Sequence, residues 1–354
     1  MTYPKIIIDL RKIEANTRLL TELCRSHGVE PVGVTKVSCG DPEVARAMLA
    51  GGMNMLAESR VENAIRLKQS GIDVPLMLLR LPMPSQAELV VENFHCSLNS
   101  ELATIQALDR AAAAVDKVHQ VVLMVDLGDL REGILPEDVE KTVAQIAPLA
   151  HIRLLGLGTN LTCYGGVIPS RENLGQLLSL NKKAEAIYGH SLPVISGGNS
   201  SSLPLLLAGK LPPVTQLRLG EGIMLGRETI ARQPIPGAHL DCFTLEAEVI
   251  ELRTKSSLPS GEIGQDAFGG TPSFEDRGNH LRAIIALGRQ DIAVDSLETP
   301  EGTDILGASS DHLLLDVSGY KNKLKVGGRL VFSPGYGALL AAMTSAYVSK
   351  EYRS

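Results

Sequence analysis

The chain has 354 residues, of which 44% are hydrophobic, 3% aromatic and 21% charged, and its formal net charge is −6. This length favours a two-domain protein, and a mildly acidic chain without tryptophan lacks the basic stripe and the stacking surface that nucleic-acid-binding proteins use. The five cysteines are scattered, the N-terminus resembles no signal peptide and no apolar run would span a membrane, so the sequence predicts a cytoplasmic protein with reduced thiols.

The first apolar run is KIIIDL at residues 5–10, which predicts a short strand. The following segment, residues 11–28, places Ile13 and Leu20 on one face and ends at a glycine, as an amphipathic helix does. Eight further strands follow in a regular pattern that leaves no place for residues 5–10. We therefore expect the N-terminal strand to pack with a later β domain.

Short apolar, β-branched runs then alternate with helical patterns up to about residue 230. Alternation of this kind indicates βα units and a parallel sheet. Eight strands, each followed by a helix, within about 220 residues fit a closed (β/α)8 barrel better than a doubly wound sheet. The sequence thus predicts a TIM-type barrel over residues 11–232, with strands at 32–37, 54–57, 75–80, 95–98, 120–126, 152–157, 192–196 and 215–218.

The pattern changes after RQPIPG at residues 232–237, where two prolines and a glycine mark a linker. Beyond it, longer segments of alternating hydrophobicity predict an antiparallel β domain over residues 233–354. The final segment, YGALLAAMTSAYVSKEY, has a helical pattern. The predicted organisation is an N-terminal strand within residues 1–10 that packs with the β domain, then the barrel, then the C-terminal β domain.

Lys36 follows the first barrel strand in PVGVTKVSCG, where one more apolar residue would be expected. Active sites of (β/α)8 barrels lie at the C-terminal ends of the strands, so this position is a candidate for function. Burial lowers the pKa of a lysine and makes its amine nucleophilic near neutral pH, as a Schiff base requires. The alternative is a lysine held in an ion pair, and Lys36 alone does not decide between the two.

Two glycine-rich loops follow the seventh and eighth strands, SGGNSSSLP at 196–204 and RLGEGIMLG at 218–226. Loops at these positions often bind a phosphate through backbone amides and a helix N-terminus. Arg218 would point into the barrel mouth beside them. It is either paired with a carboxylate or faces the ring nitrogen of pyridoxal phosphate, a cofactor that proteins bind through a lysine and an aspartate or arginine.

Taken in order, these motifs resemble those of the fold-type III pyridoxal phosphate enzymes, the alanine racemase family, over essentially the whole chain. GVTKV is similar to the strand that carries that family's Schiff-base lysine, which implies the roles of Schiff base and proton carrier for Lys36. VDLGDLREG is similar to VDTGMGRxG, which implies that Arg131 lies near the phenolic oxygen of the cofactor. GLGTN resembles GLMTH and puts Asn160 where a histidine usually stacks near the ring.

The resemblance extends to both phosphate loops. GGNSSS matches ANSA, which implies that Ser200 is a phosphate ligand. RLGEG matches RPGI, which implies that Arg218 is the partner of the pyridine nitrogen and puts Gly220 and Gly222 in the phosphate loop. A cationic arginine at that nitrogen disfavours its protonation, which suits racemisation better than transamination.

The proton carrier on the opposite face of the substrate is where the chain departs from the family. The family's tyrosine, supplied by the partner subunit in a segment like GExVSYGGT, corresponds to GEIGQDAFGGT, with Phe268 at the tyrosine position. A phenyl ring cannot transfer a proton, so we take Asp266 in the same loop as the candidate, with a turn-forming aspartate as the alternative. ASSDHLLLD resembles CMDQFMVD, which implies substrate contacts for Ser309, Ser310 and Asp311.

Within the family, LLRLPMPSQ, ALGRQD and SSDH most resemble the amino-acid racemases that include ornithine racemase. This implies a homodimer with shared active sites that racemises a free basic amino acid, ornithine first, by two-base proton transfer at the α-carbon of an external aldimine. Asp266, Glu221 or Asp311 would offer a carboxylate to the distal ammonium.

Two alternatives remain at the sequence level. One is a fold-type III D-amino-acid aldolase or dehydratase, which would need a divalent metal; the other is a protein that binds pyridoxal phosphate without turnover. We predict no metal site, because Asp311 and His312 are adjacent on a strand and point to opposite faces. We expect no nucleic-acid or membrane partner.

Overall fold

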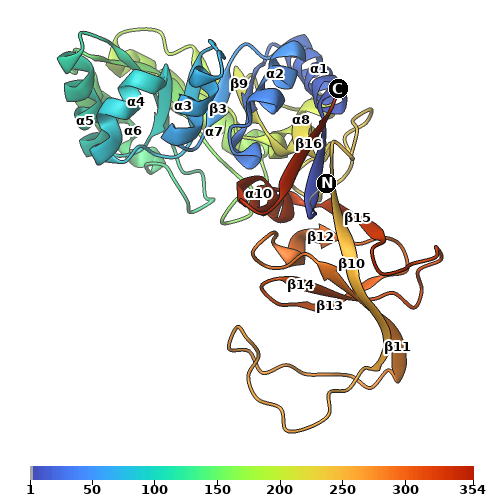
Figure 1. Cartoon of the computed structure of the whole chain (residues 1–354). Helices are drawn as coiled ribbons and strands as arrows, with labels where there is room; N and C mark the ends of the chain where they lie inside the picture. Colours follow the sequence, from blue (N-terminus) through green and yellow to red (C-terminus); the bar gives the residue numbers. More distant parts are fainter. Residues whose placement is uncertain (1–2) are drawn as a thin grey trace. The chain divides into compact units, whose positions relative to one another are not determined.

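The structure is a computed structural model that describes residues 3–354, and it divides into two compact units (Figure 1). One unit spans residues 10–240, and the other combines residues 3–9 with 241–354. The boundary predicted at 232/233 therefore lies at 240/241. The intervening segment stays with the first unit because the Ile235 amide donates to the Gly226 carbonyl oxygen (2.8 Å) and the Asn16 side chain bonds to His239.

The first unit is a closed barrel of eight parallel strands, coloured from blue to yellow in Figure 1. Each strand pairs with the next one in sequence, and the last pairs with the first. The predicted (β/α)8 barrel is confirmed. Its strands are β2 (Glu30–Val34), β3 (Leu56–Glu58), β4 (Leu76–Leu78), β5 (Cys96–Asn99), β6 (His119–Met124), β7 (Ile152–Gly158), β8 (Val194–Ser196) and β9 (Gln216–Leu219).

Helices surround the barrel, and local capping fixes where several of them begin. The carboxylate of Asp41 accepts the amide hydrogen of Glu43 at the start of α2, and Ser170 forms a capping box with Asn173 at the start of α7. The helices are α1 (Leu10–Ser26), α2 (Pro42–Ala50), α3 (Val61–Gln69), α4 (Ala87–Asn93), α5 (Leu102–Ala114), α6 (Val139–Ile146), α7 (Arg171–Tyr188), α8 (Leu203–Leu207) and α9 (Glu221–Met224). Short 3-10 turns are η1 (Lys36–Ser38), η2 (Pro84–Gln86), η3 (Pro136–Asp138) and η4 (Ser200–Ser202).

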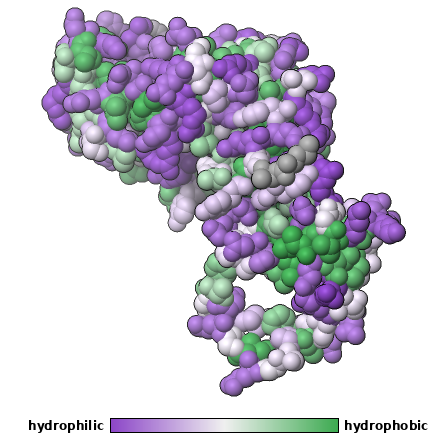
Figure 2. Space-filling view, in the orientation of Figure 1, coloured by the Kyte–Doolittle hydropathy of each residue, from purple (hydrophilic) through white to green (hydrophobic). Residues whose placement is uncertain are grey.

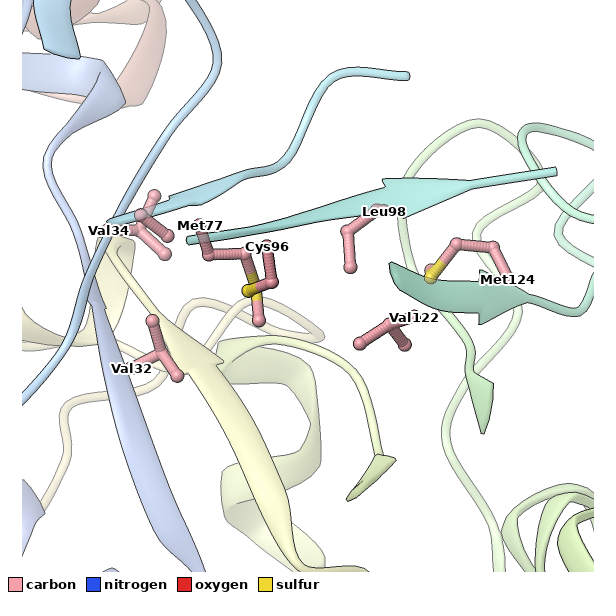
Figure 3. Packing of buried hydrophobic residues seen from close by; sticks show 8 residues of the cluster. Val32, Val34, Met77, Cys96, Leu98, Val122 and Met124 are labelled. Atoms are coloured by element: carbon pink, nitrogen blue, oxygen red, sulfur yellow. The ribbon is translucent and has the colours of Figure 1, made fainter. Parts of the chain in front are cut away.

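Apolar side chains fill the barrel interior, so the barrel is a packed core and not a pore. Figure 3 shows valine, methionine, cysteine and leucine side chains from successive strands turned toward one another. Burying one such valine or leucine contributes roughly 1.5–3 kcal/mol. This leaves the ends of the strands for chemistry. The layer consists of Val32, Val34, Ala57, Met77, Cys96, Leu98, Val122 and Met124.

The second unit is a largely antiparallel sheet in the order β12-β15-β10-β11-β14-β13. Alternating buried and exposed residues in β10 and β15 explain why the sequence predicts it. Its elements are β1 (Lys5–Asp9), β10 (Phe243–Ser256), β11 (Asn279–Ala286), η5 (Val294–Ser296), β12 (Leu297–Glu298), β13 (Asp304–Ala308), β14 (His312–Asp316), β15 (Arg329–Pro334), α10 (Tyr336–Thr344) and β16 (Ser349–Arg353).

The two ends of the chain meet in this second unit. Strand β1 pairs antiparallel with β10 and parallel with β16. The helical pattern predicted for the C-terminal tail holds only for α10, and the chain then becomes strand β16, with Val348 buried before it. Pairing with β1 overrides the local helical pattern there, since strand formation depends on the neighbouring strand. Within residues 3–354, no helix is long and apolar enough to cross a membrane.

Candidate active site

Lys36 lies two residues beyond β2, as the first residue of the 3-10 turn η1, and its side chain is partly buried. The predicted strand extended to residue 37, but the chain leaves the sheet at Thr35 and passes through left-handed backbone at Cys39 (φ 56°) and Gly40 (φ 61°). The residues of β2 that alternate with it, Val32 and Val34, face the barrel interior. Lys36 therefore stands at the C-terminal end of the barrel, where the sequence predicts a catalytic amine.

Burial is the main reason why the pKa of Lys36 lies below its ordinary value of 10.5. The Cys163 thiol and the Glu132 carboxylate oppose this effect, whereas the charges of Arg131 and Arg218 lower the pKa further. All four neighbours come from segments that follow or end barrel strands. An amine in these surroundings is neutral at a lower pH than that of a surface lysine.

Arg218 lies on β9 and is only 4% exposed. Its Nη2 atom donates to the carbonyl oxygen of Thr159 (2.7 Å) and to Oδ1 of Asn160 (3.4 Å), and its Nη1 atom donates to the Ser196 hydroxyl. Burial lowers its pKa to about 10, so the guanidinium remains cationic at neutral pH. These partners are neutral oxygens, so the guanidinium is not consumed in an ion pair with a carboxylate, which was the alternative from the sequence.

Asn160 connects Arg218 to Cys163, a residue that the sequence analysis did not select. The Nδ2 atom of Asn160 donates to Sγ of Cys163 (2.9 Å), and its Oδ1 atom also accepts from Nδ2 of Asn199 (3.1 Å). Cys163 is exposed, whereas Cys24, Cys96 and Cys242 are buried. The loop after β7 therefore brings an amide and a thiol to the arginine.

The loop after β6 carries Arg131, whose Nη2 atom donates to Oε1 of Glu132 (2.6 Å). Asp126, which precedes this loop, accepts the amide hydrogens of Gly128 (2.9 Å) and Leu130 (3.2 Å) and shapes the loop. The sequence analysis overlooked Glu132, although it adjoins Arg131 in the recognised motif. An ion pair between neighbours in one loop fixes the arginine without help from another strand.

Asp129 in the same loop is a second residue that the sequence analysis overlooked. Its carboxylate accepts amide hydrogens from Cys163 (3.2 Å), Tyr164 (3.0 Å) and Val167 (3.1 Å). Asp129 is buried, and its carbonyl oxygen also accepts the amide hydrogen of Gly165 (2.8 Å). The loop after β7 is thus wrapped around a carboxylate from the loop after β6, and this contact positions Cys163.

The two glycine-rich loops contact each other through a hydrogen bond. The Ser200 hydroxyl accepts the amide hydrogen of Gly222 (3.1 Å), so its own hydrogen is available for a ligand. Asn199 caps the turn η4 by accepting the amide hydrogen of Ser201 (2.8 Å). The buried Ser201 hydroxyl has no hydrogen-bond partner within the described part of the chain. A pair of buried serines beside Gly220, which precedes α9, suits an anionic oxygen group.

Asp266 lies in the exposed loop between β10 and β11. Its Oδ1 atom accepts the amide hydrogens of Phe268 (2.9 Å) and Gly270 (2.9 Å), and these bonds hold the pKa of the carboxyl below its ordinary value. The ring of Phe268 lies 5.1 Å from the guanidinium carbon of Arg289. Asp266 thus shapes its own loop. Its carboxyl group is ionised at neutral pH, so it can accept a proton.

Ser309, Ser310 and Asp311 form the turn between β13 and β14. The carbonyl oxygens of Ser309 and Ser310 accept the amide hydrogens of Arg289 (3.0 Å) and Gln290 (3.1 Å). The Asp311 carboxylate accepts from Nε2 of Gln290 (2.8 Å) and stays exposed. The three predicted substrate residues are therefore held against the ALGRQD segment, which the sequence analysis had singled out separately.

Glu221, the remaining carboxylate proposed for a distal ammonium, is paired with Arg232. It lies at the first position of α9 and is largely buried. Among residues 3–354, no group of three or more histidine, cysteine, aspartate or glutamate side chains is arranged to hold a metal ion.

Comparison with known proteins places the chain in a family. The model of the alanine racemase N-terminal domain matches residues 8–227. The chain is 44% identical to an ornithine racemase from Acetoanaerobium sticklandii and 41% identical to a lysine racemase from Thermotoga maritima, and each alignment covers 99% of both proteins. The chain belongs to the alanine racemase family.

Solved structures of racemases share this fold. Alanine racemase from Bartonella henselae, with covalently bound pyridoxal phosphate, superimposes with a TM-score of 0.75 at 18% identity over 100% of both chains. D-threonine aldolase from Filomicrobium marinum has the same fold, with a TM-score of 0.72 at 15% identity over 96% of this chain and 88% of that one. At these identities the likeness concerns the fold.

This member of the alanine racemase family is an isomerase, an amino-acid racemase that depends on pyridoxal phosphate. The barrel residues fit that cofactor. A partly buried amine, a buried cationic arginine and an unpartnered buried serine hydroxyl meet the needs of its aldehyde, ring nitrogen and phosphate. A Cβ at Gly222 would lie 3.2 Å from the Ser200 hydroxyl and 3.1 Å from Leu203, so a side chain there would fit only if these two neighbours moved by a few tenths of an ångström.

Proposed function

We propose that this racemase is a cytoplasmic homodimer that acts on ornithine or a similar basic amino acid. One observation supports the proposed substrate: the relatives that match over the full chain at 44% and 41% identity are racemases of ornithine and of lysine. Both of those substrates have a cationic side chain. Alanine racemases match at lower identity, such as one from Symbiobacterium thermophilum at 31% over 44% of this chain and one from Clostridium novyi at 23% over 92%.

In the proposed mechanism, the barrel residues hold the cofactor and move one proton. Bound pyridoxal phosphate makes the α-proton of an attached amino acid acidic. Lys36 would hold the cofactor, and its Nζ atom would take or return the α-proton on one face of the substrate. Arg218 stays cationic and would face the ring nitrogen. Arg131 would lie near the phenolic oxygen, Asn160 would lie beside the ring, and the phosphate would be held by Ser200, Gly220 and Gly222.

The other face of the substrate needs a second proton carrier, and we assign it to Asp266 of the partner subunit. The carboxylate is ionised, so it is ready to accept an α-proton in one direction of the reaction. The competing assignment is a carboxylate that only shapes its turn, which its bonds to Phe268 and Gly270 also explain. The two assignments differ in whether Asp266→Asn affects one enantiomer.

A homodimer agrees with the apolar surface of the second unit. Figure 2 shows a green patch on that unit, over the region of β10 and β15. Monomeric proteins rarely expose a large contiguous apolar patch, and several large apolar side chains of this unit are exposed. They include Leu258, Ile263, Phe268, Phe274, Ile305, Leu306, Val326 and Val331. We propose that a second copy covers part of this surface and that each active site receives residues from both subunits.

Substrate contacts are proposed for the turn at Ser309, Ser310 and Asp311. The hydroxyls and amides of this turn would bind the substrate carboxylate. Asp311 keeps its carboxylate exposed, so it is better suited to a distal ammonium than Glu221, which Arg232 already neutralises.

The decisive experiment is exchange of the α-proton in deuterated water, followed by NMR for a panel of single amino acids. Ornithine and lysine should exchange fastest, and norvaline, which has the same number of carbon atoms as ornithine but no distal ammonium, should exchange slowly. The purified protein should also elute as a dimer. Exchange confined to alanine and other neutral amino acids would contradict the proposed substrate, and the complete absence of exchange with any amino acid would contradict the proposed reaction.

A further inference from the structure

Glu58 is a fully buried carboxylate at the end of β3, beside the turn that carries Lys36, and the proposed mechanism does not use it. Strands β2 and β3 pair with Val34 opposite Ala57, and the Thr35 amide donates to the Ala57 carbonyl oxygen (3.1 Å). Thr35 and Glu58 are therefore neighbours at the mouth of the barrel. A carboxylate buried at this place is costly unless its bonds compensate.

Three donors converge on the Glu58 carboxylate. The Thr35 hydroxyl donates to Oε1 (2.6 Å), while the Ser59 amide (3.0 Å) and Nδ2 of Asn63 (3.0 Å) donate to Oε2. Each of these groups has a hydrogen to give, so together they favour the ionised carboxylate. The residue that immediately precedes Lys36 is thus tied by a charge-assisted hydrogen bond to the adjacent strand.

The same network also holds the other end of the lysine turn. Oδ1 of Asn63 accepts from Nη1 of Arg66 (3.1 Å), and the same Arg66 atom donates to the carbonyl oxygen of Cys39. Gly40 packs directly on Asn63, since a Cβ at Gly40 would lie 2.7 Å from Cβ of Asn63. The turn from Thr35 to Gly40 is therefore fixed at both ends by Glu58 and its partners.

Glu58 and Lys36 also influence each other through their charges. The pKa of Glu58 lies above its ordinary value, because burial outweighs the three hydrogen bonds and the charge of Lys36, which favour the ionised form. The other charged or titratable groups that act on Lys36 are Cys163, Arg131, Glu132 and Arg218. Because Coulomb attraction is mutual, the Glu58 carboxylate favours the ammonium form of Lys36.

We propose that Glu58 is a positioning residue for racemisation: through Thr35 and Asn63 it fixes the turn that aims Nζ of Lys36 into the barrel mouth, and its negative charge balances the cations there. The inference rests on the proposed role of Lys36. Glu58 touches neither substrate nor cofactor in this scheme. Its effect must reach the reaction through the position and the proton affinity of the Lys36 amine.

The test compares Glu58→Gln, Thr35→Val and Thr35→Ser with the unmodified enzyme. Thr35→Val keeps the shape of Thr35 and removes the hydroxyl that Glu58 holds, whereas Thr35→Ser restores that hydroxyl. Glu228→Gln is the matched control, because Glu228 is also a buried carboxylate, but it accepts amide hydrogens of Ile230, Ala231 and Gln233. Ornithine turnover is measured for each variant as kcat and KM.

A second readout uses cofactor-free protein, prepared from the holoenzyme with hydroxylamine. Only the neutral amine of Lys36 attacks the cofactor aldehyde, so the rate of pyridoxal phosphate uptake against pH reports where Lys36 loses its proton. Glu58→Gln should move the midpoint to lower pH, because the carboxylate charge is lost. Thr35→Val should leave the midpoint in place, because the charge remains.

We expect Glu58→Gln and Thr35→Val to lower kcat by about 10- to 100-fold, the size of effect that a small misplacement of a catalytic group produces. KM should stay within about twofold, and Thr35→Ser and Glu228→Gln should resemble the unmodified enzyme. If Glu58→Gln folds poorly, the Thr35 pair decides: equal rates for Thr35→Val and Thr35→Ser overturn the proposal. An unmoved midpoint and unchanged kcat in Glu58→Gln also overturn it.

Lys36→Met separates this inference from the proposed function. If Lys36→Met retains turnover, the role proposed for Lys36 is wrong, and the positioning role of Glu58 falls with it. If Lys36→Met is inactive while Glu58→Gln matches Glu228→Gln in both readouts, the role of Lys36 stands and only the role of Glu58 is overturned.

Discussion

The hydroxyl oxygen of Ser200 accepts a hydrogen bond from the amide nitrogen of Gly222 at 3.1 Å, and this bond joins the turn after β8 to the helix after β9. A Cβ at Gly222 would crowd Ser200 (3.2 Å) and Leu203 (3.1 Å), so the absence of a side chain there favours the contact. Next to this junction, the buried hydroxyl of Ser201 has no hydrogen-bond partner among residues 3–354. A buried hydroxyl without a hydrogen-bond partner lowers the free energy of unfolding until a ligand forms a hydrogen bond with it.

Ser201→Ala should therefore act in opposite directions on stability and on cofactor binding. The cofactor-free protein should gain about 1 kcal/mol in free energy of unfolding, because a buried unpaired polar group is removed. Affinity for pyridoxal phosphate should fall by about tenfold, because one hydrogen bond to a charged group is lost. Urea unfolding of the cofactor-free protein and a spectroscopic titration with the cofactor measure the two effects.

Ser202→Ala is the matched control for this prediction. The Ser202 hydroxyl donates to the carbonyl oxygen of Gly197 (2.8 Å), so its removal should lower the free energy of unfolding by about 1 kcal/mol. A stability loss in Ser201→Ala as large as that in Ser202→Ala would contradict the assignment of Ser201 to the cofactor.

Lys36→Met should stabilise the cofactor-free protein at neutral pH. Burial lowers the pKa of Lys36 in the folded state below 10.5, so between the two pKa values the unfolded chain binds more protons than the folded one. Stability of the unmodified protein should therefore rise with pH across that window. Urea unfolding at several pH values should show the advantage of Lys36→Met shrinking as pH approaches 10.5.

Lys5→Met should change the free energy of unfolding in the opposite direction to Lys36→Met. The Glu351 carboxylate, 2.7 Å from Nζ of Lys5, is the main cause of its raised pKa. Lys5 therefore contributes stability that is fully present below the unfolded pKa and is lost as pH rises through the folded pKa. Lys5→Met should destabilise the protein at neutral pH, and the loss in free energy of unfolding should shrink in alkaline solution.

For Lys36→Met, a difference in free energy of unfolding from the unmodified protein that does not change with pH would show that the Lys36 amine is not desolvated in the folded state.

The sequence was sufficient for the parts of the molecule in which local pattern and fold agree. Alternating strands and helices define the barrel, and reading only the strand ends selects Lys36 and Arg218, both of which lie at the C-terminal end of the barrel. The helix predicted for the C-terminal tail was wrong from Ser345 onward. Strand β16 forms there because it pairs with β1, which is far away in the sequence.

The residues that the sequence analysis overlooked are those whose role depends on a neighbouring loop. Cys163 reaches Asn160 because Asp129, from the preceding loop, holds the backbone around it. No spacing within the sequence signals that contact. Glu58 could have been selected by its position, because it ends a barrel strand and Lys36 follows one. It was overlooked because a single carboxylate in LAES belongs to no recognised motif. Glu132 adjoined a recognised arginine and was overlooked because the motif leaves that position open.

Chelation of divalent metals should leave racemisation unchanged. The proposed proton carriers, Lys36 and Asp266, need no metal ion to accept a proton. Among residues 3–354, no group of three or more histidine, cysteine, aspartate or glutamate side chains is arranged to hold such an ion. The measurement is α-proton exchange of ornithine after incubation with EDTA and after gel filtration. Loss of exchange that added metal restores would contradict this expectation and would favour the metal-dependent lyase considered from the sequence.

Asp266→Asn should slow proton exchange from one enantiomer of ornithine and spare the other. The asparagine Oδ1 atom can still accept the amide hydrogens of Phe268 and Gly270, so the turn should survive while the basic oxygen is lost. General base catalysis increases the rate of proton transfer by about 100-fold or more. Exchange from the enantiomer that depends on Asp266 should slow by that factor, whereas the other enantiomer depends on Lys36 on the opposite face of the substrate. Exchange of L-ornithine and D-ornithine is measured separately by NMR in deuterated water.

Phe268→Leu is the control for Asp266→Asn, because it removes the ring beside Arg289 and leaves the carboxylate and its turn in place. It should lower exchange of both enantiomers to the same extent, if at all. Should Asp266→Asn exchange both enantiomers at the rate of the unmodified enzyme, Asp266 only shapes its loop, and the second proton carrier must be sought elsewhere. Asp311 is a titratable residue among the proposed substrate contacts, and His312 follows it in the sequence, which makes Asp311→Asn the next variant to measure.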